Sequence, residues 1–296
     1  GGIPIIKPLR DCLAANRIQA VPGIINGTTN YILTGMARDG LDFHTMMQRA
    51  QEAGYAEADP TSDVEGYDAA FKLAILASIA FETPVRVEDV YCEGISRISP
   101  VDIEYGKALG YTVKLLAVAK EDDGRLELRV HPAFIPADHP LAAVNDVFNA
   151  IFVEGDAVGE LMFYGRGAGG KPTGSAVVAD IIEAARRIRA GSGHISARPA
   201  RHLPVKPMDD TVCQFYVSLR VVDAPGVLAA ISGVFGRYGV SIRSVIQNGP
   251  VEAPLDLVFV THEAQEADVR QALADIDELP VVRSISNVIR VEEPEP

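Results

Sequence analysis

The stretch YTVKLLAVAKEDDGRLELRVHPAFI, residues 111–135, decides the fold class of the N-terminal part of this chain. Two runs of β-favouring residues flank the turn sequence KEDDG, and in the second run Leu126, Leu128 and Val130 alternate with polar residues. This pattern is typical of a β-hairpin. Two further strands are expected, at 147–153 and 157–164. Since helices lie among these strands without a regular βαβ series, we predict an α+β fold with a mixed or antiparallel sheet.

Helical patterns flank these strands. They cover residues 28–37, 42–53, 68–81 and 174–190. Asp42 is the expected N-cap of the second helix, and Gly54 is its expected end. The third helix is apolar on nearly every face, so we expect it to run through a core.

The C-terminal part has a different pattern. Residues 191–210 contain two glycines, three prolines and no sustained hydrophobic period, as expected of a linker. Beyond them the order is strand, helix, strand, strand, helix, strand, which predicts a ferredoxin-like βαββαβ module. The expected domains are therefore 1–190 and 211–296, joined by the linker.

Composition excludes several classes of function. The 296 residues include 27 basic and 40 acidic side chains, and the formal charge of −13 opposes binding to nucleic acid or anionic membranes. A small-molecule partner is expected instead. Cys12, Cys92 and Cys213 are far apart and lack CxxC spacing, so neither a disulfide framework nor a zinc site is predicted. The chain lacks a membrane-spanning apolar run and a signal-peptide pattern, so we expect a cytoplasmic protein.

An acidic stretch, GYAEADPTSDVEGYDAAFK at 54–72, ends on a single lysine. Asp68 and Lys72 are four residues apart and would share one face of a helix, with the acid before the base. One interpretation is a surface salt bridge. The other is a site, because a partly desolvated lysine beside carboxylates can exchange a proton with a substrate oxygen. The acids do not have the spacing of a calcium loop, which disfavours a metal site here.

Three glycine-containing turns are candidate binding elements. In GIINGTTNYIL, residues 23–33, the helix N-terminus offers unpaired N–H groups to an anion, or is a simple helix cap. The stretch YGRGAGGKPTGSAVVAD, residues 164–180, matches the pattern G-x-G-x-x-G of dinucleotide-binding folds. In such folds a second parallel strand follows the helix, whereas here the expected linker follows it. This loop either lets the backbone approach a ligand or is a glycine-rich turn. In RVVDAPGVL, residues 220–228, a strand turns into a helix whose N-terminus can hold a carboxylate, or belongs to a dimerising module without ligand.

In order along the chain, GGIPIIKPLR, GIINGTTNYILTGM, AQEAGYAEADPTSDVEGYDAAFKLAILASIAF and YGRGAGGKPTGSAVVAD resemble homoserine dehydrogenase. The linker and βαββαβ module resemble the ACT domain that many bacterial members carry. The resemblance implies NAD(P)-dependent interconversion of L-homoserine and L-aspartate 4-semialdehyde, in threonine and methionine biosynthesis. The rival hypotheses are a non-catalytic amino-acid sensor and a related oxidoreductase acting on another small hydroxy or amino acid.

The resemblance also implies residue roles. Lys72 would exchange the proton at the substrate oxygen, with Asp68 beside the substrate. The implied substrate-binding residues are Gly27, Thr28, Tyr55, Glu57 and Asp63. Those implied near the nicotinamide are Gly54, Gly165, Gly167 and Gly169. Backbone carbonyls of Gly1 and Ile3 would form part of a Na⁺ or K⁺ site. The implied contacts for a regulatory ligand, expected to be threonine, are Asp223, Gly226, Val227, Leu228, Gln247 and Asn248. Gln247 and Asn248 have an equally good explanation as turn formers.

The family's N-terminal nucleotide-binding domain and its second functional lysine do not occur in this sequence. We therefore expect a fragment, or a chain whose first domain is not included, and predict no dehydrogenase activity and no tight NAD(P) binding for residues 1–296 alone. Residues 172–190 would pack on that domain and should show an exposed apolar face. A homodimer or homotetramer is expected, because ACT modules and open sheets often pair across two-fold axes.

Overall fold

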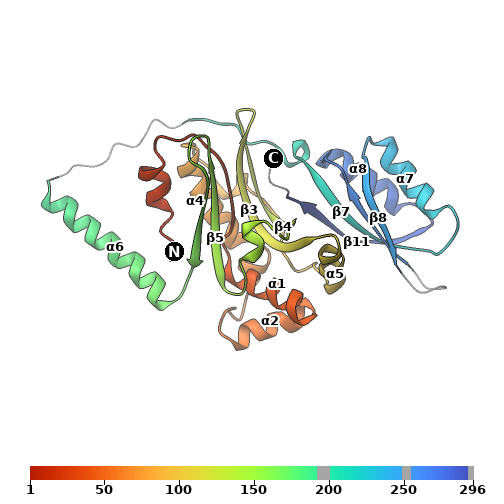
Figure 1. The fold of residues 1–296 in the computed structure, drawn as a ribbon, viewed down its shortest axis with the longest axis horizontal. Helices are drawn as coiled ribbons and strands as arrows, with labels where there is room; N and C mark the ends of the chain where they lie inside the picture. Colours follow the sequence, from red (N-terminus) through yellow and green to blue (C-terminus); the bar gives the residue numbers. More distant parts are fainter. Residues whose placement is uncertain (192–200, 249–254, 293–296) are drawn as a thin grey trace. The chain divides into compact units, whose positions relative to one another are not determined.

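A computed structural model describes residues 1–191, 201–248 and 255–292. The chain divides into two compact units (Figure 1). The first unit comprises residues 1–96, 114–131 and 138–205. The second comprises residues 97–113, 132–137 and 206–296. The second unit thus contains the βαββαβ module together with two segments that the sequence assigns to the N-terminal part.

The first unit is built on a mixed sheet, as predicted. Its strands are β1 (Ile18–Ile24), β2 (Tyr91–Cys92), β3 (Tyr111–Asp122), β4 (Arg125–Pro136), β5 (Phe148–Gly155) and β6 (Gly159–Arg166). Their order is β6-β5-β1-β3-β4, with β2 also paired to β4. The β1, β5 and β6 pairings are antiparallel, whereas β2 runs parallel to β4. The long strands β3 and β4 contribute residues to both units.

The predicted hairpin is confirmed as β3 and β4. Asp123 and Gly124 lie between the two strands, and both have positive φ, at 51° and 74°. Two left-handed residues in a two-residue loop produce the turn whose twist matches that of antiparallel strands, which explains the Asp-Gly pair here.

The helices of the first unit include the predicted ones, whose bounds agree to within a few residues, and several short ones that the sequence did not predict. They are η1 (Pro8–Cys12), α1 (Gly27–Asp39), α2 (Phe43–Glu52), α3 (Thr61–Val64), α4 (Tyr67–Ala80), η2 (Val87–Asp89), η3 (Pro140–Ala143) and α6 (Gly170–Arg189). Asp42 caps α2 as predicted, because its carboxylate accepts the Thr45 N–H at 2.8 Å. No helix in the described residues is long and apolar enough to cross a membrane.

Two apolar helices have exposed faces. In α4, Tyr67, Phe71 and Ile75 are each at least half exposed, so the expectation that this helix runs through a core on nearly every side is wrong. Only the opposite face is buried, and it includes Ala70 and Leu73. Helix α6 has no buried residue. Its exposed apolar side chains, expected from the sequence, are Val177, Val178, Ile181, Ile182 and Ile188.

The second unit contains the predicted βαββαβ order. Its elements are α5 (Pro100–Ala108), η4 (Met208–Asp210), β7 (Val212–Val221), α7 (Val227–Arg237), β8 (Ile242–Asn248), β9 (Leu255–Thr261), β10 (Ala264–Gln265), α8 (Glu266–Asp277) and β11 (Val282–Val291). The sheet order β11-β7-β9-β8 is antiparallel throughout. Apolar side chains of α7 and α8 pack with those of the sheet into one core.

A buried carboxylate explains why α5 groups with this module. Asp102 of α5 is 2% exposed and accepts hydrogen bonds from the Tyr216 hydroxyl at 3.2 Å and the Asn287 amide at 2.9 Å. The two donors lie on β7 and β11. Burying a carboxylate is costly unless it is well hydrogen-bonded, so this arrangement ties α5 to both strands.

Candidate active site

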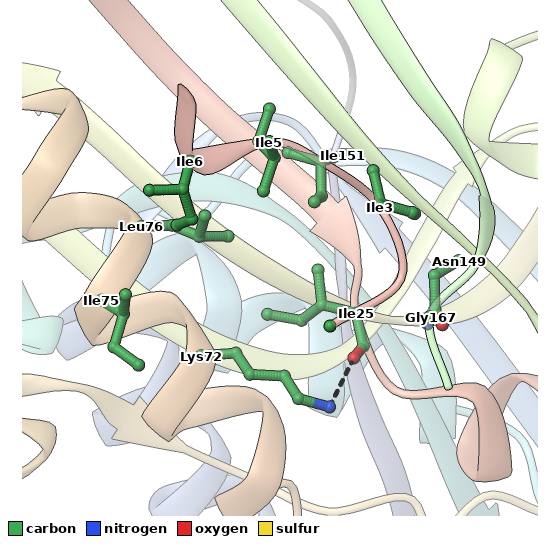
Figure 2. A pocket seen from close by; sticks show the side chains of 11 residues that line it. Ile3, Ile5, Ile6, Ile25, Lys72, Ile75, Leu76, Asn149, Ile151 and Gly167 are labelled. Atoms are coloured by element: carbon green, nitrogen blue, oxygen red, sulfur yellow. Dashed lines mark hydrogen bonds between the residues drawn. The ribbon is translucent and has the colours of Figure 1, made fainter. Parts of the chain in front are cut away.

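Lys72 and Asp68 form the predicted pair on one face of α4. The Lys72 Nζ donates to Asp68 Oδ2 at 2.6 Å. It also donates to the Ile25 carbonyl oxygen, just after β1, at 3.2 Å (Figure 2). The side chains are 44% and 32% exposed. The lysine is therefore held in one place by a charged and a neutral acceptor while part of its surface stays accessible to a substrate.

Asn26 lies at the centre of this group. Its side chain is 5% exposed, and Nδ2 donates to Asp63 Oδ1 at 2.7 Å and to Asp68 Oδ2 at 2.9 Å. Its Oδ1 accepts the Thr29 N–H at 2.9 Å and so caps α1. One amide thus joins two carboxylates to a helix N-terminus. The residue roles inferred from the sequence omit Asn26, although an asparagine directly before a helix is a recognisable N-cap signal.

The N-terminus of α1 lies against the loop after α2. Thr28 Oγ1 donates to the Tyr55 carbonyl at 2.8 Å, and the rings of Tyr31 and Tyr55 are 4.9 Å apart. A Cβ added to Gly27 would lie 3.0 Å from the Val147 carbonyl oxygen, so glycine permits this close approach. The structure therefore brings Gly27, Thr28 and Tyr55 together, and their contact with a substrate stays a prediction.

The remaining acidic residues behave differently. The Glu57 side chain is exposed, and the backbone carbonyl of this residue accepts from Gln51 Nε2 at 3.1 Å. Asp59 accepts from the hydroxyl and the N–H of Thr61, and these bonds hold the pKa of its carboxyl below the usual value. Asp59 thus shapes the loop. Among the described residues, no group of three or more potential ligands is arranged to hold a metal ion.

A pocket of about 220 Å³ opens beside Lys72 (Figure 2). Its lining residues are Gly1, Ile3, Ile5, Ile6, Ile25, Lys72, Ile75, Leu76, Asn149, Ile151 and Gly167. Most of these side chains are apolar, and the polar groups are the Lys72 ammonium and the Asn149 amide. The pocket can therefore enclose an apolar or flat ring-shaped group with the Lys72 side chain at its edge.

Close backbone packing builds one side of this pocket. The Gly2 N–H donates to the Gly167 carbonyl at 2.8 Å, and Asn149 Nδ2 donates to the Ile24 carbonyl at 3.0 Å. A Cβ on Gly167 would lie 2.0 Å from Asn149 Oδ1, so any other residue there would displace the Asn149 side chain. Asn149 is a second residue that sequence reasoning missed, because nothing local marks it.

Only part of the predicted cofactor set lines the pocket. Of this set Gly167 lines the pocket, whereas Gly54, Gly165 and Gly169 do not. Gly1 and Ile3, which are predicted to bind a cation, also line it. Gly54 follows α2 with φ of 74°, and Gly169 is the N-cap of α6 with φ of 117°. Both conformations favour glycine, which gives each a structural explanation.

The second unit has its own pocket, of about 200 Å³, at the turn between β7 and α7. It is lined by Val221, Val222, Asp223, Ala224, Gly226, Val227, Leu228, Gln247, Leu255 and Leu257. Every predicted regulatory residue except Asn248 belongs to this set. The Asn248 backbone instead pairs with Asp256 in the β8–β9 ladder.

Comparisons with known proteins match the N-terminal and the C-terminal part of the chain to two different family models. Residues 4–182 match the family model described as homoserine dehydrogenase, and residues 215–281 match that of the ACT domain. A homoserine dehydrogenase from Synechocystis sp. is 48% identical over 301 residues, which cover 98% of this chain and 70% of that protein. The crystal structure of a homoserine dehydrogenase from Thiobacillus denitrificans matches with a TM-score of 0.94 at 43% identity, covering 99% of this chain and 68% of that one. A hyperthermophilic archaeal homoserine dehydrogenase in complex with NADPH matches with a TM-score of 0.55 at 29% identity, over 67% of this chain and 55% of that one.

Proposed function

Because this chain belongs to the homoserine dehydrogenase family of oxidoreductases, we propose that Lys72 is the residue that exchanges a proton with the substrate oxygen. The observation that carries this proposal is the Lys72 Nζ, held by Asp68 Oδ2 at 2.6 Å and by the Ile25 carbonyl at 3.2 Å beside the pocket. A positioned group of this kind can take the proton of a hydroxyl or return it to an aldehyde oxygen.

The carboxylates around Asn26 supply the second part of the site. Homoserine carries an ammonium group, and Asp63 and Asp68, joined by the Asn26 amide, offer it negative charge. Glu57, on the neighbouring exposed loop, is proposed as a further ligand of that ammonium. The N-terminus of α1 at Gly27 and Thr28, with Tyr55 beside it, is proposed to hold the substrate carboxylate, because unpaired helix N–H groups bind anions.

Oxidation of the substrate alcohol to the aldehyde removes one hydride and one proton. NAD(P), on which the family depends, supplies the hydride acceptor when it is bound. The apolar pocket walls and the close packing of Gly167 on Asn149 fit the nicotinamide end of such a cofactor. Lys72 takes the proton in this direction as the neutral amine, and the ammonium so formed donates a proton to the aldehyde oxygen in the reverse direction. Gly54, Gly165 and Gly169 are proposed as the backbone flanking the cofactor.

We propose an amino-acid effector, threonine, for the pocket at the β7–α7 turn. Support comes from the exposed N-terminus of α7 at Gly226, with φ of 90°, and from the neighbouring Asp223 and Gln247. The helix N–H groups suit a carboxylate, and the acidic side chain suits an ammonium. Asn248 lies next to Gln247 on β8 and is proposed as a further contact. Calorimetric titration with threonine tests this assignment, and absence of heat at millimolar threonine would reject it.

Gly1 and Ile3, at the edge of the Lys72 pocket, are proposed to offer backbone carbonyls to Na⁺ or K⁺. We propose that the protein assembles as a homo-oligomer. The proposed domains of each chain are residues 1–190 and 211–296. Turnover measured in salts of different monovalent cations checks the cation site, and light scattering checks the assembly. A turnover rate that does not depend on the cation would contradict the cation site, and a monomeric mass would contradict the homo-oligomer.

The decisive experiment is Lys72→Ala in the complete enzyme that carries this chain. We expect kcat to fall by about 10²- to 10⁴-fold, the usual contribution of a positioned acid or base. Lys107→Ala is the matched control, because Lys107 is an exposed lysine on α5. Turnover at the wild-type rate in Lys72→Ala would reject the catalytic assignment of Lys72.

A further inference from the structure

Lys114 is a buried lysine that the proposed reaction does not use. It lies on β3 and is 1% exposed. Its Nζ donates to the Val144 carbonyl at 2.6 Å, to Asn30 Oδ1 at 3.1 Å and to Asn145 Oδ1 at 3.2 Å. An ammonium has three N–H donors, so each donor here has an acceptor. Burial lowers the pKa of Lys114 to about 8, against an opposing effect of the Asp146 carboxylate.

Asn30 extends this contact into a network. The Asn30 side chain is 1% exposed, and its Nδ2 donates to the Val144 carbonyl at 3.1 Å and to the Phe148 carbonyl at 3.0 Å. Val144 therefore accepts from both Lys114 and Asn30. The network fastens three segments to one another, namely β3, the first turn of α1 and residues 144–148.

Two of these segments lead directly to the candidate active site. The first turn of α1 begins at Gly27, next to its cap Asn26, which holds both Asp63 and Asp68. Residues 144–148 continue into Asn149, which lines the pocket beside Lys72. Gly27 is also close to this segment, because a Cβ there would lie 3.0 Å from the Val147 carbonyl. A shift of α1 against residues 144–148 would thus move the carboxylates relative to the pocket.

We infer that Lys114 is a positioning residue, whose buried ammonium fastens the substrate-binding end of α1 to the segment that leads into the pocket. This inference rests on the proposed function of the site. Stability alone explains the lysine poorly, because an apolar side chain of similar length fills such a place without the cost of burying a charge. The ammonium instead sets the relative position of two polar segments whose carbonyl and amide oxygens need donors.

The test is Lys114→Met in the complete enzyme, with Lys107→Met as the exposed control. Methionine has a similar length but no donors, so α1 loses the part of its link to residues 144–148 that runs through Lys114 and keeps only the Asn30 bonds to the Val144 and Phe148 carbonyls. We expect KM for homoserine to rise about tenfold, the sign of lost substrate binding. A merely structural role would lower the folded fraction, and with it Vmax, but would leave KM unchanged. Unchanged KM in folded Lys114→Met protein would overturn the inference.

If Lys114→Met does not fold, Asn145→Ala carries the test. Asn145 is exposed, and its truncation removes one acceptor of Lys114 together with a 3.2 Å bond to the Ala143 carbonyl. We expect KM for homoserine to rise about threefold, and an unchanged value overturns the inference. Lys72→Ala tests the proposed function separately from the Lys114 inference. If Lys72→Ala loses turnover while KM is unchanged in Lys114→Met, the catalytic assignment stands and only the Lys114 inference fails. If Lys72→Ala turns over at the wild-type rate, the catalytic assignment itself is rejected.

Discussion

Lys72 and Lys114 lie in the same compact unit, and their surroundings differ in every respect that matters for proton exchange. The Lys72 side chain is 44% exposed, borders the pocket and pairs with a carboxylate. Lys114 is 1% exposed, and its three acceptors are a carbonyl and two amide oxygens. A lysine that exchanges protons must reach a substrate, whereas a lysine whose donors are all engaged by the protein can only hold segments together.

The largest expected effect concerns the chemistry of Lys72. In Lys72→Arg the positive charge and the pairing with Asp68 persist, but a guanidinium stays protonated under all ordinary conditions and cannot accept a proton. We expect kcat to fall by about 10²-fold or more, measured as steady-state homoserine oxidation. Lys107→Arg serves as the control. Near-wild-type turnover would show that Lys72 acts through charge alone.

The second prediction concerns pH and Lys114. Its pKa is lowered to about 8 in the folded protein, below its ordinary value near 10.5 when unfolded. Between these pH values the unfolded chain binds more protons, so the free energy of unfolding rises with pH in that window. Relative to Lys114→Met, the gain should approach about 3 kcal/mol by pH 10.5. Urea unfolding of the wild-type protein and of Lys114→Met at several pH values measures this gain. If the free energy of unfolding changed with pH in the same way in both proteins, the prediction would be contradicted.

The third prediction separates the two roles of Asn26. In Asn26→Ser the hydroxyl can still cap α1, so the free energy of unfolding should change by less than about 1 kcal/mol. The hydrogen bonds to Asp63 and Asp68 are lost, and kcat/KM for homoserine should fall about tenfold. Thermal unfolding and steady-state kinetics give the two values. Wild-type kinetics would mean that the amide only caps the helix.

Local sequence pattern explains what could be predicted about the fold. The β3–β4 hairpin follows from alternation and from Asp123-Gly124, whose positive φ angles suit its turn. The cap at Asp42 and the pairing of Asp68 with Lys72 depend on residues three or four positions apart. The exposed face of α4 was missed, because a sequence shows how apolar a helix is but not how many of its sides are covered.

The sequence by itself determined the β3–β4 hairpin, the βαββαβ module and the pairing of Asp68 with Lys72, because each depends on neighbours along the chain. Only the tertiary structure decided that Asn26 joins two carboxylates, that Asn149 packs on Gly167, and that Lys114 finds its acceptors on α1 and on residues 144–145. It likewise assigned 97–113 to the second unit, through Asp102. These partners are distant in sequence, and a buried polar group takes whichever partner the fold brings within hydrogen-bonding distance.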